Sequence, residues 1–163
     1  MHMVISVGAR LPDSNFQIMT DEGAASKPTE EIFGQRRIVL FALPGAYTPT
    51  CHMKHLPGYI EHFDIFKSMG IDEVACLSVN DIFVLDHWSR DTGAKDRILF
   101  LADGSCLFTK AIGLENNATS RGMGYRSKRY SMLVEDSVLV NLNIDEKRGD
   151  LSLSSAEHML SLL

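Results

Sequence analysis

The sequence predicts an α/β domain with a mixed central sheet flanked by helices, and three observations lead to this fold class. Residues 37–43, 73–79 and 97–103 are short apolar runs without the alternation of a half-exposed strand. Segments with helical periodicity separate these runs. Two adjacent strand-like segments and a last helical segment then close the chain. This order predicts parallel strands first and an antiparallel edge later.

Polar and helical segments surround the first apolar run. Residues 21–37 are polar and predict a loop that leads into a short helix. A longer helix is predicted over residues 51–69, where apolar side chains recur every three or four residues. These side chains are Met53, Leu56, Ile60, Phe63 and Phe66. Pro57-Gly58 falls inside this pattern, and because proline removes one helical hydrogen bond, we expect a kink or short break there.

The second half of the chain carries two helical segments and a hairpin. Residues 81–93 predict a helix that ends at a glycine, and a shorter helix follows the turn at 103–105. Residues 129–136 and 138–144 are separated by a short turn and predict a β-hairpin. This hairpin supplies the antiparallel edge of the sheet.

The last element is a predicted helix over residues 154–163, with Ser154 or Ser155 as its N-cap. A thioredoxin-like arrangement fits the complete order of elements. The chain of 163 residues has the length of one ordinary domain, so we expect a single domain over residues 1–163.

Charge and hydropathy exclude several classes of function. The net charge of −5 does not suit a nucleic-acid surface, and no apolar stretch approaches the roughly 18 residues that span a bilayer. We therefore expect neither a nucleic-acid partner nor a membrane partner.

The start of the chain lacks the layout of a signal peptide, and the three cysteines are an odd number. Both features favour free thiols in a reducing compartment, and we expect a cytoplasmic location.

Cys51 stands at the head of the long predicted helix, directly after a buried strand. Thr48 is a good N-cap, and Pro49 suits the first helical position, where its missing N–H costs nothing. Cys51 then falls in the first turn, where unpaired N–H groups and the helix dipole favour a thiolate. The sequence therefore predicts a reactive cysteine. The alternative is a capped helix whose early cysteine is only a small apolar residue.

The other two cysteines are expected to be structural. Cys76 lies in the middle of a buried strand, where a cysteine usually fills the core. Its rival role is to form a disulfide with Cys51. Cys106 could also lie in a first helical turn, but Asp103 is close in sequence and opposes a thiolate there.

The histidines near Cys51 could bind a metal ion or could be solvated or hydrogen-bonded side chains. Cys51, His52 and His55 could hold zinc, but a zinc site needs three or four ligands and no second cluster is evident, so we expect no metal. If no metal binds, the histidines are expected to be solvated or hydrogen-bonded side chains, and His55 could influence the thiolate.

The basic patch at residues 125–130 is typical of a solvated surface. Within it, Arg129 precedes a strand and could pair with a thiolate.

Several ordered blocks of the sequence resemble the peroxiredoxin family. "PGAYTPTC" at residues 44–51 is similar to the family's motif of proline, threonine and cysteine. "FALPGAYTPTCHMKHLPGYIEHF", "ACLSVNDIFVLDHW", "FLADGS", "GMGYRSKRYSMLVED" and "SSAEHML" resemble the peroxiredoxin 5 subfamily, also called type II. The similarity runs through nearly the whole chain and is much more specific than the short motif.

The resemblance implies a thioredoxin fold and the reduction of hydrogen peroxide and organic hydroperoxides without a cofactor, metal or haem. Cys51 would be the peroxidatic cysteine, and Thr48 and Arg129 would contact the thiolate and the peroxide. Pro44 would shield the pocket, and the backbone N–H of Gly45 would bind a peroxide oxygen. The product on sulfur would be a sulfenic acid, which a thiol must reduce.

One departure from the family concerns the second cysteine. Some members carry a resolving cysteine just before the last helix, where this chain has "DLSLSSAEHML". The chain therefore resembles a one-cysteine form, recycled by glutathione with glutaredoxin or by thioredoxin. The resemblance also implies a homodimer through the surface around the active site.

Two rival functions remain: a thiol–disulfide oxidoreductase on the same fold, and a redox sensor, which shares its first step with the peroxidase. A thiol–disulfide oxidoreductase usually pairs two cysteines as Cys-x-x-Cys, and this chain has "TPTC" instead. A redox sensor would pass oxidation of Cys51 to a partner protein. Mass spectrometry of the mixed disulfides that Cys51 forms in cells would distinguish the two functions. A partner protein in the disulfide indicates a sensor, and turnover with glutathione indicates an enzyme.

Overall fold

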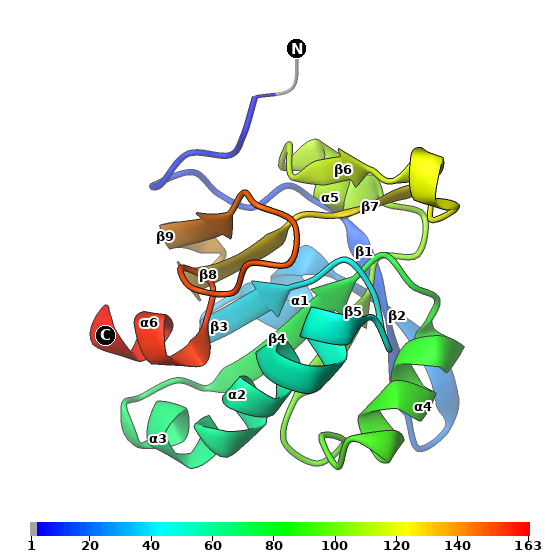
Figure 1. Ribbon diagram of the computed structural model, residues 1–163. Helices are drawn as coiled ribbons and strands as arrows, with labels where there is room; N and C mark the ends of the chain where they lie inside the picture. The colour runs from blue at the N-terminus through cyan, green and yellow to red at the C-terminus, as the bar shows by residue number, and fades with distance from the viewer. Residues whose placement is uncertain (1–2) are drawn as a thin grey trace.

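A seven-stranded mixed sheet forms the centre of the computed structural model, which describes residues 3–163 (Figure 1). The strand order is β2-β1-β5-β4-β3-β8-β9. These strands are β1 (Asn15–Thr20), β2 (Gly23–Pro28), β3 (Arg37–Ala42), β4 (Glu73–Ser78), β5 (Leu99–Ala102), β8 (Arg129–Glu135) and β9 (Val138–Asp145). Within residues 3–163, no helix has the length and apolar character needed to cross a bilayer.

The three apolar runs form the parallel centre of this sheet. β3 pairs in parallel with β4, and β4 pairs in parallel with β5. β8 then pairs antiparallel with β3 and with β9, which is the predicted hairpin at the edge. The thioredoxin-like α/β fold with a mixed sheet is therefore confirmed.

Helices cover both faces of the sheet and divide the core into two layers (Figure 1). Alternate residues of β3 face opposite sides, so Phe41 joins one cluster and Leu40 the other. The Phe41 layer contains α2, α3, α4 and α6, whereas the Leu40 layer contains α1 and α5. The helices are α1 (Thr29–Phe33), α2 (Leu56–Glu61), α3 (Phe63–Ser68), α4 (Ile82–Asp91), α5 (Leu107–Ala111) and α6 (Ala156–Ser161).

The polar segment 21–37 contains a strand that the sequence did not predict. β2 pairs with β1 in an antiparallel hairpin that runs from Thr20↔Gly23 to Asn15↔Pro28, and only then does the expected short helix α1 begin. β2 lies at the edge of the sheet and buries little, so its sequence of small and polar residues lacks an apolar signal.

The long predicted helix is divided into three pieces, but not at Pro57-Gly58. Its first full turn is η1 (Cys51–His55), a π-helical turn that α2 continues, and the break before α3 falls at His62. Pro57 has no N–H to offer a preceding carbonyl, and the helix continues through it directly after the π-helical turn. The wider turn also changes which residues face inward, so Met53 is 73% exposed although the periodicity placed it on the apolar face.

A small two-stranded ribbon lies outside the main sheet and was also not predicted. β6 (Glu115–Asn117) pairs antiparallel with β7 (Tyr125–Ser127), and the short 3₁₀ helix η2 (Thr119–Arg121) connects them. In Figure 1 this ribbon, coloured from yellow-green to yellow, lies beyond the ends of β3 and β4. It therefore stands beside the segment that leads from β3 to Cys51.

Candidate active site

The segment between β3 and the first helical residues sets the position of Cys51. The helix begins at Pro49, as the sequence predicts, and the Thr48 carbonyl accepts its first hydrogen bond from the N–H of His52 at 2.9 Å. The Thr48 hydroxyl donates to the Gly45 carbonyl at 2.7 Å, which closes the loop on itself. Cys51 therefore lies in the first helical turn, beside backbone N–H groups that lack helical partners.

Arg129 contacts the sulfur of Cys51 directly. Its Nη2 donates to Cys51 Sγ at 3.1 Å, and both side chains are buried. The sheet explains this meeting, because β8 runs antiparallel to β3 and pairs Tyr130 with Ala42. The start of β8 and the end of β3 thus lie at one edge of the sheet, although Cys51 and Arg129 are far apart in sequence. In such a buried site the charged hydrogen bond is stronger than in water.

His55 holds the other side of the Arg129 guanidinium. Its Nδ1 accepts from Arg129 Nη1 at 2.9 Å, which leaves Nε2 to donate to the Ser154 carbonyl at 3.0 Å. Tyr59 also donates to that carbonyl, at 2.8 Å. Burial, and then the positive charge of Arg129, lower the pKa of His55 from 6.5 to about 3. His55 is therefore neutral at physiological pH and bridges the guanidinium and the backbone.

Asp145 fixes the turn that presents the Ser154 carbonyl. It lies opposite Arg129 in the β8–β9 register. Its carboxylate accepts from the backbone N–H groups of Ser152, Leu153 and Ser154 and from two serine hydroxyls. Burial raises the pKa of Asp145, but these hydrogen bonds outweigh burial and hold the pKa below its ordinary value. A chain of polar contacts thus runs from Asp145 through the turn to His55, Arg129 and the sulfur.

The buried neutral state of His55 predicts a loss of stability in acid. Because its folded pKa lies below 6.5, the unfolded chain binds more protons between about pH 3 and 6.5, and stability falls as the pH falls. We expect this site alone to lower the free energy of unfolding by about 2 kcal/mol from pH 7 to pH 5. Urea unfolding of the wild type and His55→Gln at both pH values measures the effect.

The His55→Gln variant is the matched control for that measurement. A glutamine offers Arg129 an oxygen acceptor and Ser154 an N–H donor, but it does not titrate. We expect the variant to lack the His55 component of the pH dependence. Equal losses of stability in the two proteins would contradict the assignment of this component to His55.

An aromatic cluster attaches the same loop to α4. Trp88 Nε1 donates to His52 Nδ1 at 2.8 Å, and the Tyr47 hydroxyl donates to Asp91 at 2.6 Å. The hydrogen bond to Asp91 raises the pKa of Tyr47 to about 12. Tyr47 has a φ of 63°, a left-handed conformation that is uncommon outside glycine, and its ring stacks on His52. These contacts hold both sides of the turn that carries Cys51.

The remaining cysteines are buried elsewhere, as the sequence predicts. Cys76 lies in β4 opposite Phe41 and belongs to the core layer that contains Cys51. Burial raises the pKa of its thiol well above the ordinary value. Burial and then the charge of Asp103 raise the pKa of Cys106. Neither thiol is therefore prepared to be a nucleophile.

The structure places every predicted site residue on the segment from β3 to η1 or at the start of β8. Gly45 is buried and Pro44 and Thr48 are half-buried at the head of this segment, while Arg129 faces Cys51. No group of three histidine, cysteine, aspartate or glutamate side chains in the described part of the chain could hold a metal ion.

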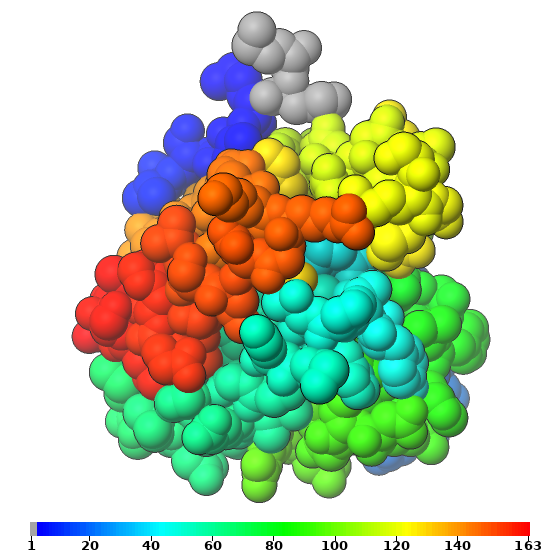
Figure 2. Space-filling model, viewed as in Figure 1, coloured from blue at the N-terminus to red at the C-terminus, as the bar shows by residue number. Residues whose placement is uncertain are grey.

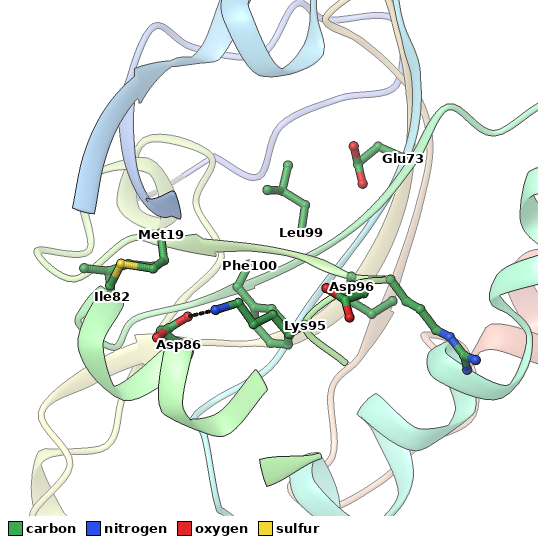
Figure 3. Close-up of a pocket in the computed structure, with 10 residues that line it drawn as sticks. Met19, Glu73, Ile82, Asp86, Lys95, Asp96, Leu99 and Phe100 are labelled. Carbon is green, nitrogen blue, oxygen red and sulfur yellow. Dashed lines mark ion pairs between the residues drawn. The ribbon is translucent and has the colours of Figure 1, made fainter. Parts of the chain in front are cut away.

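Two hollows lie away from the Cys51 sulfur. The first, of about 180 Å³, is lined by Glu73 and Leu99 at the starts of two parallel strands and by the Asp86–Lys95 ion pair of 3.7 Å (Figure 3). It therefore lies at the opposite end of the sheet from Cys51. The second, of about 420 Å³, is a groove between α2 and α6 that has His55 in its wall.

Comparisons with known proteins agree with this geometry. A family model described as Redoxin matches residues 6–160. Peroxiredoxin-2E, chloroplastic, of Arabidopsis thaliana is 40% identical, covering 98% of this chain and 69% of the relative. Peroxiredoxin-2F, mitochondrial, of the same plant is 42% identical, covering 86% of this chain and 72% of the relative.

Solved structures of peroxiredoxins superpose closely on the chain. Reduced Prx3 of Vibrio vulnificus in complex with H₂O₂ is 42% identical and has a TM-score of 0.94, covering 98% of this chain and 99% of that one. The antioxidant protein of Plasmodium falciparum, named a 1-Cys peroxiredoxin, is 29% identical with a TM-score of 0.91, covering 97% and 98%.

The comparisons correct the expected location. The prediction of a cytoplasmic location is wrong, because relatives at 40–42% identity are named as chloroplastic or mitochondrial and point to an organelle. The physical reason is that free thiols indicate only a reducing compartment, and they do not distinguish the cytoplasm from the interior of such an organelle.

The family model and the solved peroxiredoxin structures match nearly the whole chain, and the fold brings an arginine to a buried cysteine at a helix start. The chain therefore belongs to the peroxiredoxin family of thiol-dependent peroxidases.

Proposed function

We propose that Cys51 is the peroxidatic nucleophile of this enzyme and that Arg129 and Thr48 assist it. The observation that carries this proposal is the 3.1 Å contact between Arg129 Nη2 and Cys51 Sγ inside a buried site. A guanidinium held at this distance gives the sulfur the electropositive surroundings in which reactive cysteines are found. The His55 bridge supports the proposal because it keeps the guanidinium in one orientation.

The proposed first step transfers one oxygen to sulfur. The Cys51 thiolate attacks one peroxide oxygen, a new S–O bond forms, and the O–O bond breaks with its electron pair on the second oxygen. That oxygen takes up a proton and leaves as water or an alcohol, and Cys51 becomes a sulfenic acid. The guanidinium of Arg129 stabilises the negative charge that develops on the leaving oxygen, and the Thr48 hydroxyl does the same once it turns from the Gly45 carbonyl to the bound peroxide.

The loop before Cys51 completes the proposed pocket. We assign to Pro44 the exclusion of water, and to the backbone N–H of Gly45 a hydrogen bond to a peroxide oxygen. Gly45 suits this role because it is buried, and an added Cβ there would lie 3.3 Å from Thr48 Cγ2. A side chain at this position would therefore crowd the threonine that faces the substrate.

We further propose that the chain is a one-cysteine enzyme of the peroxiredoxin 5, or type II, subfamily. Its other cysteines, Cys76 and Cys106, are both buried and their pKa values are raised. An external thiol then attacks the sulfenic acid, releasing water and forming a mixed disulfide, and a second thiol frees Cys51. Glutathione with glutaredoxin, or thioredoxin, supplies these thiols in the proposed scheme.

Intact mass spectrometry after one equivalent of hydrogen peroxide tests the one-cysteine scheme. We expect a gain of one oxygen on Cys51 without glutathione, and a glutathione adduct on the same residue with it. An intramolecular disulfide to Cys76 or Cys106 would overturn the scheme, because the resolving thiol would then be internal.

The assembly and the domain organisation are also proposals. Tyr47 beside Cys51 and Phe83 on the neighbouring α4 are 45% and 69% exposed, and we propose that they contribute to a homodimer interface around the active site. Light scattering of the reduced protein tests the proposed homodimer, since a monomer mass would exclude it.

We also propose that residues 1–163 form one domain, because one family model spans residues 6–160.

A further inference from the structure

Arg126 is half-buried beside the active-site loop, and none of the carboxylates in residues 3–163 pairs with it. The other half-buried arginines behave differently, since Arg36 pairs with Glu73 at 2.8 Å and Arg37 pairs with Glu135 at 2.9 Å. A half-buried guanidinium whose protein partners are only carbonyl oxygens keeps its positive charge available to a bound anion. Arg126 therefore differs from its counterparts in the same molecule.

The side chain of Arg126 extends from β7 to the end of the parallel sheet. Its Nε donates to the Met123 carbonyl at 2.8 Å, and its Nη1 donates to the Val79 carbonyl at 3.0 Å. These two bonds fix the guanidinium plane but leave Nη2 and one Nη1 hydrogen without an acceptor among residues 3–163. The remaining donors form a fork of the kind that binds a carboxylate.

The fixed guanidinium lies against the loop that carries the proposed peroxide pocket. An added Cβ at Gly45 would be 3.4 Å from Arg126 Nη1 and 3.3 Å from Thr48 Cγ2, so Arg126 and Thr48 flank the same residue. Figures 1 and 2 show the yellow ribbon that carries Arg126 above the cyan segment at residues 43–50. A molecule whose reactive end reaches Cys51 can therefore place its other end near Arg126.

We propose that Arg126 binds a carboxylate of a substrate whose reactive group reaches Cys51. This inference rests on the proposed function of Cys51 and adds a recognition site to it. Hydrogen peroxide has no carboxylate, so the group belongs either to a small peptide thiol that reduces the sulfenic acid or to a carboxylated organic hydroperoxide. A carboxylate on the Arg126 fork orients either molecule for attack at the sulfur.

Kinetic measurements with Arg126→Gln distinguish the two sources. Glutathione is compared with 2-mercaptoethanol as the reductant, and a fatty-acid hydroperoxide is compared with tert-butyl hydroperoxide as the oxidant. We expect the variant to lose about tenfold in rate constant with the carboxylated member of one pair, and to lose far less with its uncharged partner. If the rate loss in Arg126→Gln is confined to glutathione, the carboxylate belongs to the peptide thiol. If the loss is confined to the fatty-acid hydroperoxide, the carboxylate belongs to the peroxide.

Two further variants separate recognition from a structural role. Arg126→Lys retains the charge without the fork, and we expect it to restore only part of the selectivity. Lys27→Gln removes one positive charge at the far edge of the sheet, and we expect no change in selectivity. If Arg126→Gln slows all four compounds equally, or none, then Arg126 only holds the ribbon and the proposal is wrong.

The wild type tests the underlying function independently. If one equivalent of hydrogen peroxide fails to oxidise Cys51 in the wild type, the proposed function fails whatever the Arg126 variants do. If Cys51 is oxidised but the carboxylate selectivity of the wild type and Arg126→Gln is the same, only the Arg126 site fails.

Discussion

Cys51→Ser is expected to abolish peroxide turnover, with a fall of about a thousandfold or more and no loss of fold. A serine hydroxyl stays protonated beside Arg129, so it provides no anionic nucleophile where the sulfur now receives the hydrogen bond of 3.1 Å. Consumption of hydrogen peroxide with a thiol reductant measures the activity. Circular dichroism and thermal unfolding show whether the variant is folded.

Cys76→Ala is the matched control for Cys51→Ser. It also removes a buried thiol from the same core layer, but its strand position and raised pKa leave it outside the proposed chemistry. We expect it to keep turnover within about twofold of the wild type and to lose some stability, because a small cavity replaces the sulfur. Normal turnover by Cys51→Ser would refute the assignment of the nucleophile, as would an inactive but folded Cys76→Ala.

Arg129→Met has the second-largest expected effect. It removes the cation from the sulfur and from His55 while keeping a side chain of similar length for the core. Loss of one well-placed donor to a developing oxyanion typically costs about a hundredfold to a thousandfold. We expect a decrease of this size in the rate constant for loss of the Cys51 thiol with hydrogen peroxide, measured by stopped-flow thiol trapping.

The variant Arg129→Lys separates charge from geometry. A lysine supplies one ammonium group, which cannot bond to both Cys51 Sγ and His55 Nδ1 in the plane that the guanidinium provides. We therefore expect partial activity, between that of the wild type and that of Arg129→Met. Full activity in Arg129→Lys would show that only the charge matters and that the His55 bridge has no kinetic role.

The sequence was sufficient to predict the elements whose residues have a strong local pattern. The three apolar runs became β3, β4 and β5 because strands buried on both faces need unbroken apolar residues. Thr48, Pro49 and Cys51 marked the helix start at Pro49, although the Thr48 hydroxyl donates to the Gly45 carbonyl and is not seen to cap the helix. Arg129 followed from its place before a strand and from the family resemblance.

Contacts between distant segments lacked such a pattern. Nothing near His55 shows that its ring will meet the Ser154 carbonyl, since that turn is positioned by Asp145 at the end of another strand. The sequence of β2 predicts a loop, because an edge strand needs few apolar residues. The sequence around Arg126 predicts a solvated basic patch, and only the tertiary structure shows that no carboxylate of the described residues pairs with it.

The hydrogen bond from Trp88 to His52 gives the molecule a built-in optical reporter. Trp88 is the only tryptophan of the chain, it is fully buried, and its indole N–H bonds to the residue that follows Cys51. Indole emission depends on the polarity and the hydrogen bonding around the ring. A rearrangement of the π-helical turn after oxidation would therefore change the intrinsic fluorescence, so the redox state of the sulfur can be followed in real time without an attached dye.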